Sequence, residues 1–420
     1  MTEHGNSEGK RIAVVGSLTN AMLNFRSDLI RDMVAAGHTV YAFASDYDAK
    51  SQAEVEALGA IAVPYQLNRF SYNPFNDLLT SWQLYRLFKQ LKIDVSFCYF
   101  VKPVLFGTLA AWLAKVPYRV AKIEGLGRAF IDKPGGNGLV CRLIRQVQVQ
   151  LYRFVLPKTH QVFLLNPDDY QDLIHHYDIP IPKLTILNGI GTCLQRYPYH
   201  PPQLEPIRFI FVGRLLQEKG IRYFLDAAKV IKAQYPRVEF VVVGEPDTAK
   251  GSISRDELTQ HIDSGLIVYP GMVSNVVDWL AQASVFVLPS YYREGVPRST
   301  QEAMAVGLPV ITTDMPGCRE TVQHGNNGFL IPPHQVDALI DSMRYFVEHP
   351  EQIDSMGQCS RKLAEEKFDV VKINQQIIKA MGLERQHTHS QVSVATDNGQ
   401  DQLKLNAFNA ANEAIEKQPK

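Results

Sequence analysis

The chain has 420 residues, of which 45% are hydrophobic and 20% are charged. This length is too great for one ordinary domain and suits two, and the composition excludes an intrinsically disordered protein. Lys and Arg together number 43, as do Asp and Glu, so the net charge indicates no partner.

Neither the N-terminal residues nor any apolar run indicates a protein inserted in a membrane. The first ten residues are polar, unlike a signal peptide, and the longest apolar run, 104–114, is far shorter than the ~20 residues of a membrane span. The five cysteines are scattered without a CxxC pair, which favours reduced thiols over a disulfide or zinc framework. We therefore expect a cytoplasmic protein.

Apolar segments rich in β-branched residues alternate with amphipathic segments in the first half of the chain. The apolar segments predict strands at 11–16, 38–44, 61–65, 95–99, 118–123 and 162–165. The amphipathic segments predict helices, most clearly at 23–36, 76–91 and 139–156. Such alternation is typical of a parallel sheet covered by helices on both faces.

A loop rich in Pro, Tyr and His at 197–206 interrupts this alternation and predicts a linker. Beyond it, strands are predicted at 208–212, 238–244, 266–269, 284–288 and 309–312, with a helix at 218–233. The sequence thus predicts two α/β domains with doubly wound parallel sheets, 1–198 and 199–358, facing each other across a cleft. Residues 359–382 are expected to form a helix returning to the first domain, and the polar residues 383–420 a mobile tail.

Basic residues concentrate between Arg86 and Lys158. This stretch holds thirteen Lys and Arg against three acidic residues, Asp94, Glu124 and Asp132. Such an excess in a neutral protein indicates an anionic partner, either a phosphate-bearing substrate or a lipid headgroup surface.

The first candidate site is the segment FVGRLLQEKG at 211–220. Gly213 ends a predicted strand and lets the backbone approach a ligand closely. Arg214 and Lys219 follow at the mouth of that strand, where two cations can hold a diphosphate. The alternative is a strand-end turn with two solvated cations.

The second candidate site is PSYYREGVPRSTQE at 289–302, which follows another predicted strand. Seven residues separate Glu294 from Glu302, so the two carboxylates can engage different parts of one ligand. The helix is expected to be capped by Ser299, with amides and dipole directed at a phosphate. A capping box of Ser299 with Glu302 is a compatible alternative, but it leaves Glu294 unexplained.

These two segments, with the continuation EAMAVGLPVI at 302–311, strongly resemble glycosyltransferase family 4. The resemblance extends from residue 11 to about residue 381 and is most specific between 211 and 328. It implies a GT-B fold of two Rossmann-like domains and transfer of a sugar from a nucleotide sugar, usually UDP-linked, with retention of the anomeric configuration. The UDP-sugar would be a co-substrate, and no separate cofactor is expected.

The resemblance also implies roles for the matching residues. Arg214 and Lys219 would bind the diphosphate, Glu294 the donor hexose, and Glu302 the ribose hydroxyls. The remaining donor-site positions are Gly16, Gly213, Gly271, Met272, Ser290, Gly295, Val296 and Pro297.

The segments IEGLGRAF at 123–130 and TDMPGCRE at 313–320 resemble a narrower branch of that family. That branch builds polyprenyl-diphosphate-linked oligosaccharides for O-antigen, capsule or protein glycosylation, in some members by adding N-acetylgalactosamine. The basic stretch fits such an acceptor. We expect Arg142, Arg145 and Arg153, on the helix predicted at 139–156, to contact the cytoplasmic face of the inner membrane; the alternative is an ordinary core-facing helix.

One position departs from the family pattern. Many relatives carry a His at the end of the fifth strand, whereas the nearest equivalent in this chain is Glu124. We expect Glu124 to act on the acceptor side as a polar or basic group, and the departing phosphate is an alternative acceptor of the proton. No metal is expected, because Arg214, Lys219 and the helix amides would neutralise the leaving diphosphate.

Two other functions remain open at this point. A sugar-nucleotide epimerase of the same fold would bind the donor without an acceptor. A non-catalytic nucleotide-sugar-binding subunit would bind it without turnover, although such proteins tend to lose the charged residues that are intact in this chain.

Overall fold

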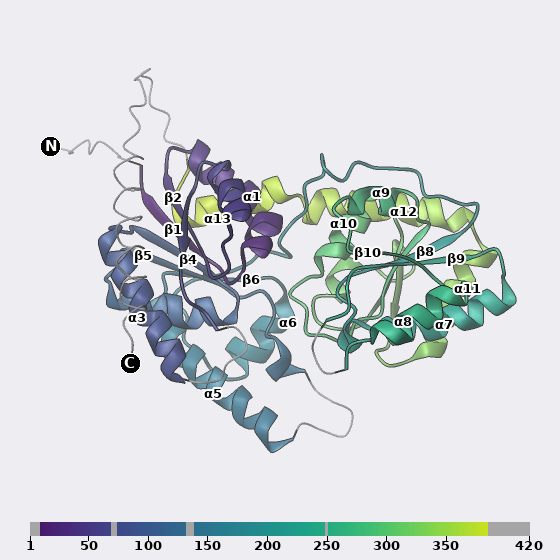
Figure 1. Cartoon of the computed structure of the whole chain (residues 1–420), viewed down its shortest axis with the longest axis horizontal. Coiled ribbons are helices and arrows are strands. Elements are labelled where there is room, and N and C mark those ends of the chain that lie inside the picture. The colour runs from purple at the N-terminus through teal and green to yellow at the C-terminus, as the bar shows by residue number, and fades with distance from the viewer. Residues whose placement is uncertain (1–8, 69–73, 132–137, 248–250, 385–420) are drawn as a thin grey trace.

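The computed structural model describes residues 9–68, 74–131, 138–247 and 251–384, which form two α/β domains placed side by side (Figure 1). The seven strands of the first sheet are all parallel and run in the order β3-β2-β1-β4-β5-β6-β7. Their bounds are β1 (Arg11–Val15), β2 (Thr39–Ala44), β3 (Ile61–Pro64), β4 (Val95–Tyr99), β5 (Tyr118–Lys122), β6 (Gln161–Leu164) and β7 (Leu184–Ile186).

Helices cover both faces of this first sheet. Because side chains alternate along a strand, Ile12 and Val14 of β1 pack on one face, while Ala13 and Val15 pack on the other. The first face carries α1 (Thr19–Ala35) and α2 (Ala49–Glu56). The second face carries α3 (Pro74–Gln90), α4 (Thr108–Leu113) and α5 (Leu139–Val155).

The second domain repeats this plan with six parallel strands in the order β10-β9-β8-β11-β12-β13. The strands are β8 (Arg208–Val212), β9 (Glu239–Val243), β10 (Val268–Gly271), β11 (Val285–Leu288), β12 (Val310–Thr313) and β13 (Gly328–Ile331). The helices are α7 (Ile221–Gln234), α8 (Arg255–Asp263), α9 (Val276–Ala281), α10 (Arg298–Val306), α11 (Val336–Glu348) and α12 (Glu351–Lys367).

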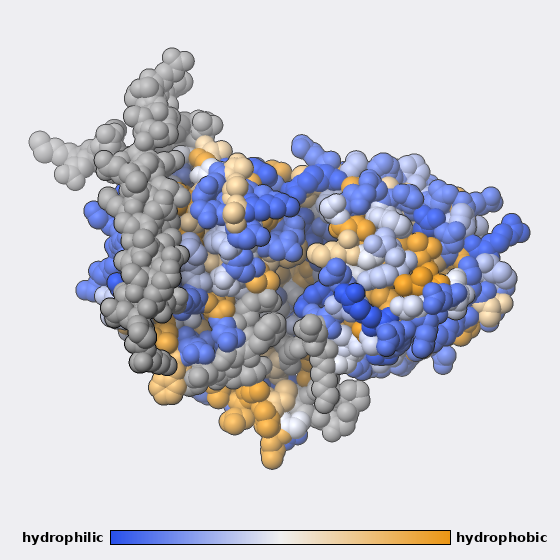
Figure 2. Space-filling view, viewed as in Figure 1, coloured by the Kyte–Doolittle hydropathy of each residue, from blue (hydrophilic) through white to orange (hydrophobic). Residues whose placement is uncertain are grey.

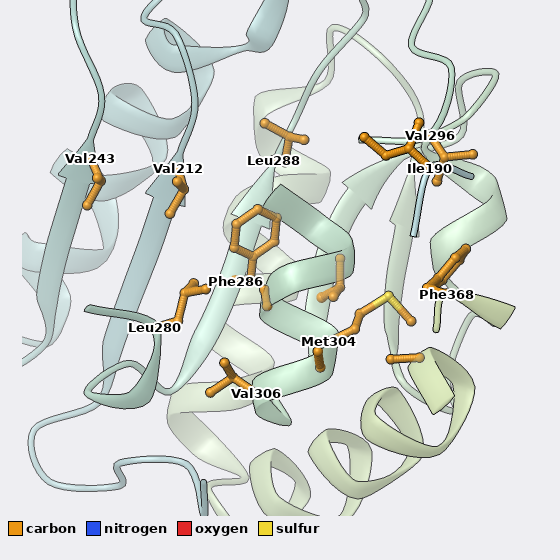
Figure 3. Close-up of a cluster of buried hydrophobic side chains, with 14 of the residues drawn as sticks. Ile190, Val212, Val243, Leu280, Phe286, Leu288, Val296, Met304, Val306 and Phe368 are labelled. Carbon is orange, nitrogen blue, oxygen red and sulfur yellow. The ribbon is translucent and has the colours of Figure 1, made fainter. Parts of the chain in front are cut away.

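A buried apolar cluster fixes α10 to the second sheet (Figure 3). Phe286 and Leu288 project from β11, and Met304 and Val306 from α10, and all four are fully buried. This packing bears on the candidate site because α10 begins within the second candidate segment, at Arg298.

The last described helix, α13 (Val370–Met381), returns to the first domain and lies beside α1 (Figure 1). The Asn374 side-chain amide donates to Asp32 Oδ2 at 2.9 Å, and the Tyr118 hydroxyl donates to the Ala380 carbonyl at 2.9 Å. The chain therefore crosses between the domains twice.

The predicted doubly wound architecture is confirmed, apart from two edge strands. The edge strands β7 and β13 were not predicted, because β7 has only three half-buried residues and β13 is a short segment beginning with a glycine. In each sheet the strand order reverses between two central neighbours, β1 and β4 or β8 and β11. Ligands bind at such switch points, beyond the carboxyl ends of the strands.

Candidate functional site

Loops at the carboxyl ends of both sheets enclose a cavity of about 600 Å³ between the domains. The first domain contributes the segments after β1, β4 and β5, and the second contributes the segments after β8 and β11. Seven of the residues predicted from the sequence lie on its wall, namely Glu124, Arg214, Lys219, Glu294, Gly295, Val296 and Pro297.

Lys219 and Glu294, both expected to bind the donor, form an ion pair on this wall. Lys219 Nζ contacts Glu294 Oε1, and the Ser290 hydroxyl donates to the same oxygen at 3.2 Å. Both charged side chains are largely buried. A ligand at this position would meet one cation and one carboxylate that already hold each other in place.

The backbone ties the two predicted segments together. The Glu218 carbonyl accepts hydrogen bonds from the amides of Tyr291 and Tyr292, at 2.9 and 3.1 Å, and from the Ser290 hydroxyl at 3.1 Å. Gly220 has φ of +82°, and a Cβ there would lie 2.1 Å from the Pro289 carbonyl oxygen, so only glycine fits. Residues far apart in sequence thus form one rigid donor wall.

Arg214 stands at the open part of the same wall. Its guanidinium donates to Asp247 Oδ2 at 3.0 Å, yet 59% of the side chain is exposed. An exposed guanidinium beside a buried Lys219 is suited to hold the oxygens of an incoming diphosphate.

The start of α10 differs from the prediction. The helix is capped at Pro297 without a side-chain hydrogen bond, so the expected Ser299 cap and the capping box with Glu302 are wrong. Glu302 instead accepts a hydrogen bond from Arg298 Nε at 2.9 Å and lies beside the Tyr197 hydroxyl. Burial raises the pKa of Glu302, and Arg298 opposes that rise.

Several predicted donor residues lie behind the cavity wall or away from it. A Cβ on Gly16 would lie 2.0 Å from the Tyr99 hydroxyl, so Gly16 supports the wall instead of lining it. Gly213 packs under Gly244, whose Cβ would meet the Gly213 carbonyl at 2.0 Å. Ser290 is buried behind Glu294, and Glu302 is absent from the residues that line the cavity. Gly271 ends β10, and Met272, the next residue, is largely exposed.

Glu124 reaches the cavity from the opposite domain, within a buried cluster of charges. Its Oε1 contacts the guanidinium of Arg26 and lies 3.2 Å from Lys122 Nζ. Burial lowers the pKa of Arg26 to about 10 and holds the pKa of Lys122 well below its ordinary value, with Arg26 adding repulsion. The Arg26 guanidinium also lies over the Tyr99 ring, 4.7 Å from its centroid.

The loop that carries Glu124 packs directly on the loop that carries Glu294. Gly125 has φ of +92°, and a Cβ there would lie 2.9 Å from the Gly295 amide nitrogen. Asn166 reinforces this contact, because its side-chain amide donates to the Gly295 carbonyl at 2.6 Å. The loops that carry Glu124 and Glu294 therefore meet at the cavity wall.

Asn166 begins a short acidic segment, α6 (Pro167–Asp169), that faces cations of the second domain. Arg293 pairs with Asp169, at 3.6 Å, and with Asp172, while Arg319 pairs with Asp168 at 3.0 Å. Burial raises the pKa of Asp169 to about 7, and Arg293 limits the rise. This segment fastens the two domains on the far side of Glu294.

The sequence prediction missed Arg26, Lys122, Asn166 and Arg293. Arg26 and Asn166 carry no motif signal, because each gains its role by meeting residues distant in the chain. Arg293 lies inside the second candidate segment without a role assigned to it, and Lys122, two residues before Glu124, was counted only in the charge excess.

The described residues contain no group of three or more His, Cys, Asp and Glu side chains placed to hold a metal ion. The Asp-Tyr-Asp segment at 46–48 resembles a metal-binding DxD motif, but its two carboxylates accept hydrogen bonds from neighbouring residues of the first domain. Asp46 accepts hydrogen bonds from the Thr19 amide and hydroxyl, and Asp48 caps α2 by accepting from the Ser51 amide.

Helix α5 packs on the core through its second half and exposes apolar side chains in its first half. Val149, Tyr152 and Val155 are buried, as in a core-facing helix, whereas Leu139, Val140 and Leu143 are among the most exposed apolar side chains described. Arg142 is exposed, Arg145 donates to the Ala129 carbonyl at 2.7 Å, and Arg153 contacts the Tyr177 carbonyl. Among the described helices none is both long and apolar enough to cross a bilayer.

Two family models match the chain, one in each domain. Residues 27–192 match "Glycosyltransferase Family 4", and residues 206–349 match "Glycosyl transferases group 1". The model boundaries fall on either side of the connection between the two sheets.

The chain matches two curated relatives over most of the length of each. The chain is 28% identical over 351 residues to the N,N'-diacetylbacillosaminyl-diphospho-undecaprenol alpha-1,3-N-acetylgalactosaminyltransferase of Campylobacter jejuni, covering 80% of this chain and 89% of the relative. It is 26% identical over 310 residues to the UDP-Gal:alpha-D-GlcNAc-diphosphoundecaprenol alpha-1,3-galactosyltransferase of Escherichia coli, covering 70% and 77%.

Solved structures agree with the fold. The Anabaena protein HepE, solved with UDP and glucose, superposes with a TM-score of 0.69 at 18% identity, covering 88% of this chain and 99% of HepE. TarM superposes with a TM-score of 0.67 at 12% identity, covering 90% and 99%. With both domain families matched in order on this two-domain fold, the chain belongs to the family 4 glycosyltransferases of the GT-B class.

Proposed function

We propose that this glycosyltransferase moves a hexose or N-acetylhexosamine, such as N-acetylgalactosamine, from a UDP-sugar to a polyprenyl-diphosphate-linked saccharide. The observation that carries the proposal is the meeting of the Lys219–Glu294 pair with Glu124 in one interdomain cavity. The names of the Campylobacter and Escherichia coli relatives support the acceptor class, since both act on undecaprenyl-diphosphate-linked sugars.

In this proposal the donor diphosphate binds Arg214 and Lys219, and Glu294 accepts hydrogen bonds from hydroxyls of the donor sugar. The bond between the anomeric carbon and the phosphate oxygen breaks, and an acceptor hydroxyl attacks from the same side, so the configuration is retained. Lys219, Arg214 and the first-turn amides of α10 stabilise the charge on the leaving UDP.

The acceptor proton has two proposed destinations. The leaving phosphate lies on the face from which the hydroxyl attacks and can take the proton itself. Glu124 lines the same cavity and can orient that hydroxyl or take its proton. Because the cations already present neutralise the leaving group, the proposal assigns no metal.

We also propose that the protein works at the cytoplasmic face of the inner membrane, where a polyprenyl-diphosphate acceptor is presented. Arg142 is exposed on α5 beside exposed apolar side chains. Cationic residues beside an apolar surface favour peripheral contact with anionic lipids.

The test is UDP release by the purified protein across a panel of UDP-hexoses and UDP-N-acetylhexosamines, each with and without polyprenyl-diphosphate-sugar acceptors. Release that requires one donor together with the lipid acceptor is the expected result. Conversion of the donor sugar without UDP release would instead identify an epimerase. UDP binding without release from any pair would identify a binding subunit.

A further inference from the structure

Arg293 directly precedes Glu294 in the sequence and pairs with acids of the opposite domain. Its guanidinium lies 3.6 Å from Asp169 and contacts Asp172. Asp169 ends α6 and Asp172 follows it closely, in the part of the chain that Figure 1 places between the two sheets. Arg293 also lines the cavity, although only 12% of its side chain is exposed. The residue before a candidate catalytic carboxylate is thus anchored in the first domain.

The residue after Glu294 is anchored in the same segment. The Asn166 side-chain amide donates to the Gly295 carbonyl at 2.6 Å and to the Glu294 carbonyl at 3.3 Å. Asn166 is fully buried and also caps α6, so its side chain is held in place. One short segment of the first domain therefore contacts the chain on both sides of Glu294.

The second domain packs closely around the same carboxylate and its backbone. Lys219 and the Ser290 hydroxyl contact Glu294 Oε1. A Cβ at Gly317 would lie 2.5 Å from the Glu294 carbonyl oxygen, so this approach requires glycine. Movement of the backbone would displace the carboxylate, and an error of about 1 Å in a catalytic geometry can lower the rate by about a hundredfold.

Two buried atoms of the Arg293 contact lack a hydrogen-bond partner among the described residues. They are the donor Arg293 Nε and the acceptor Asp169 Oδ1, and they belong to opposite domains. A buried polar group without a hydrogen bond is destabilising. A small closing movement that brought these two atoms together would satisfy both.

A second ion pair joins the domains nearby. Arg319 pairs with Asp168 at 3.0 Å, but Arg319 lies twenty-five residues after Glu294 and does not line the cavity. Figure 2 shows hydrophilic residues on both sides of the boundary between the domains. Polar contacts of this kind allow domains to separate and dock again. Of these two ion pairs, the one formed by Arg293 directly adjoins the candidate catalytic carboxylate.

From this arrangement we propose that Arg293 is a positioning residue, which docks on Asp169 and Asp172 and thereby orients Glu294 toward the donor sugar. The donor site of the second domain is then complete only in contact with the first. Because the acceptor is proposed to bind the first domain, this dependence limits loss of the sugar to water. The role toward the sugar rests on the proposed function, whereas the pairing between the domains does not.

The experiment compares two arginine variants of the full chain at pH 8. Arg293→Met should lower kcat for UDP release by about tenfold to a hundredfold, while UDP affinity stays within about twofold of the wild type. Arg293→Lys keeps the charge and should retain more of the kcat than Arg293→Met. Arg319→Met removes the other interdomain ion pair and is the matched control, with kcat expected within about twofold of the wild type.

A double-mutant cycle tests whether Arg293 acts through its two acids. Adding Arg293→Met to a protein with Asp169→Asn and Asp172→Asn should cause little further loss of kcat. Additive losses would overturn the proposal, because Arg293 would then act on the ligand directly. An equal loss in Arg319→Met, or a parallel loss of UDP affinity in Arg293→Met, would overturn it as well. If Arg293→Met does not fold, Arg293→Lys takes its place in the cycle.

Urea unfolding of the same four proteins separates this inference from the proposed reaction. We expect the combined variant to be less destabilised than the sum of the two separate changes, because the changes remove the same contact. Additive free energies of unfolding would show that Arg293 is not docked on the first domain. If no donor supports UDP release by the wild type, the proposed reaction fails, and the unfolding cycle still decides whether this pairing exists.

Discussion

Two carboxylates face one cavity from different domains, and each is held by cations. Glu294 is paired with Lys219 on the donor side, and Glu124 is paired with Arg26 and Lys122 on the acceptor side. The two carboxylates differ in the number of cations that surround them. One cation matches one carboxylate on the donor side, whereas two buried cations share one carboxylate on the acceptor side.

Lys219→Ala should weaken UDP binding by about tenfold to a hundredfold, because a charge-assisted contact to a phosphate contributes ~1.5–3 kcal/mol. Isothermal titration with UDP measures the change. Lys229→Ala, a surface cation of α7 paired with Asp226, is the matched control and should leave the affinity unchanged. Wild-type affinity in the Lys219 variant would remove that residue from the diphosphate site.

Glu294→Gln should reduce kcat much more than it reduces UDP affinity, since its proposed partner is the donor sugar and UDP has no hexose. Steady-state kinetics and UDP titration on the same preparation give the two numbers. Losses of equal size would assign Glu294 to supporting Lys219 instead.

Lys122→Met should lower kcat by about tenfold to a hundredfold, because it removes a cation paired with Glu124 Oε1, and Glu124 lines the cavity. If Lys122 positions Glu124, combining Lys122→Met with Glu124→Gln should give little more loss than Glu124→Gln alone. The pH profile of kcat should also change in the Lys122 variant. Additive losses with an unchanged profile would indicate a purely structural role.

At the scale of elements, α6 and the start of α10 decide how the two domains meet. Asn166 uses its side chain twice, accepting from the Asp169 amide at 2.7 Å to cap α6 and donating to Gly295 across the interface. One residue therefore couples the start of a helix in the first domain to the donor loop of the second.

Asp169 makes this contact sensitive to pH. Because its pKa is raised from 3.8 to about 7, its stabilising contribution is present below about pH 4 and is lost as the pH rises through 7. Asp169→Asn should remove that loss. Between pH 5 and pH 8 the free energy of unfolding of the wild type should therefore fall relative to the variant, by up to about 2.7 kcal/mol, since each of the roughly two pH units between 5 and the pKa near 7 is worth about 1.36 kcal/mol.

Urea unfolding of both proteins at the two pH values measures the difference. The comparison between the proteins cancels the titration of other groups. An identical pH dependence in both would show that Asp169 is ionised across this range.

At the scale of the whole molecule, the chain returns to its first domain through α13. That return places the last described helix against α1, while the cavity lies between the two sheets. Movement of one domain relative to the other must bend both connections.

Asn374→Ala combined with Tyr118→Phe should lower the melting temperature, because each change removes one hydrogen bond between α13 and the first domain. Each such bond contributes ~1 kcal/mol, and a domain of this size loses about 2–4 °C for each kcal/mol. Differential scanning calorimetry measures the shift. Asn326→Ala, in an exposed turn of the second domain, is the control; equal melting temperatures for all three proteins would contradict the role of this contact.

The sequence by itself determined the fold class and located the segments of the second domain that line the cavity. Parallel strands have a local signature, since each is a short run of β-branched residues, and the segments that contain Arg214, Lys219 and Glu294 follow such runs directly. Short edge strands lack that signature, which is why β7 and β13 were missed.

Only the tertiary structure decided what faces the cavity and what supports it. Gly16 and Ser290 lie behind the wall, and Glu302 pairs with Arg298, because the direction of each side chain depends on neighbours from other elements. Arg26 meets Glu124 across almost a hundred residues of sequence, and the two lie beside Lys122. A linear pattern records which residues are present, whereas burial and charge pairing arise only when distant segments come together.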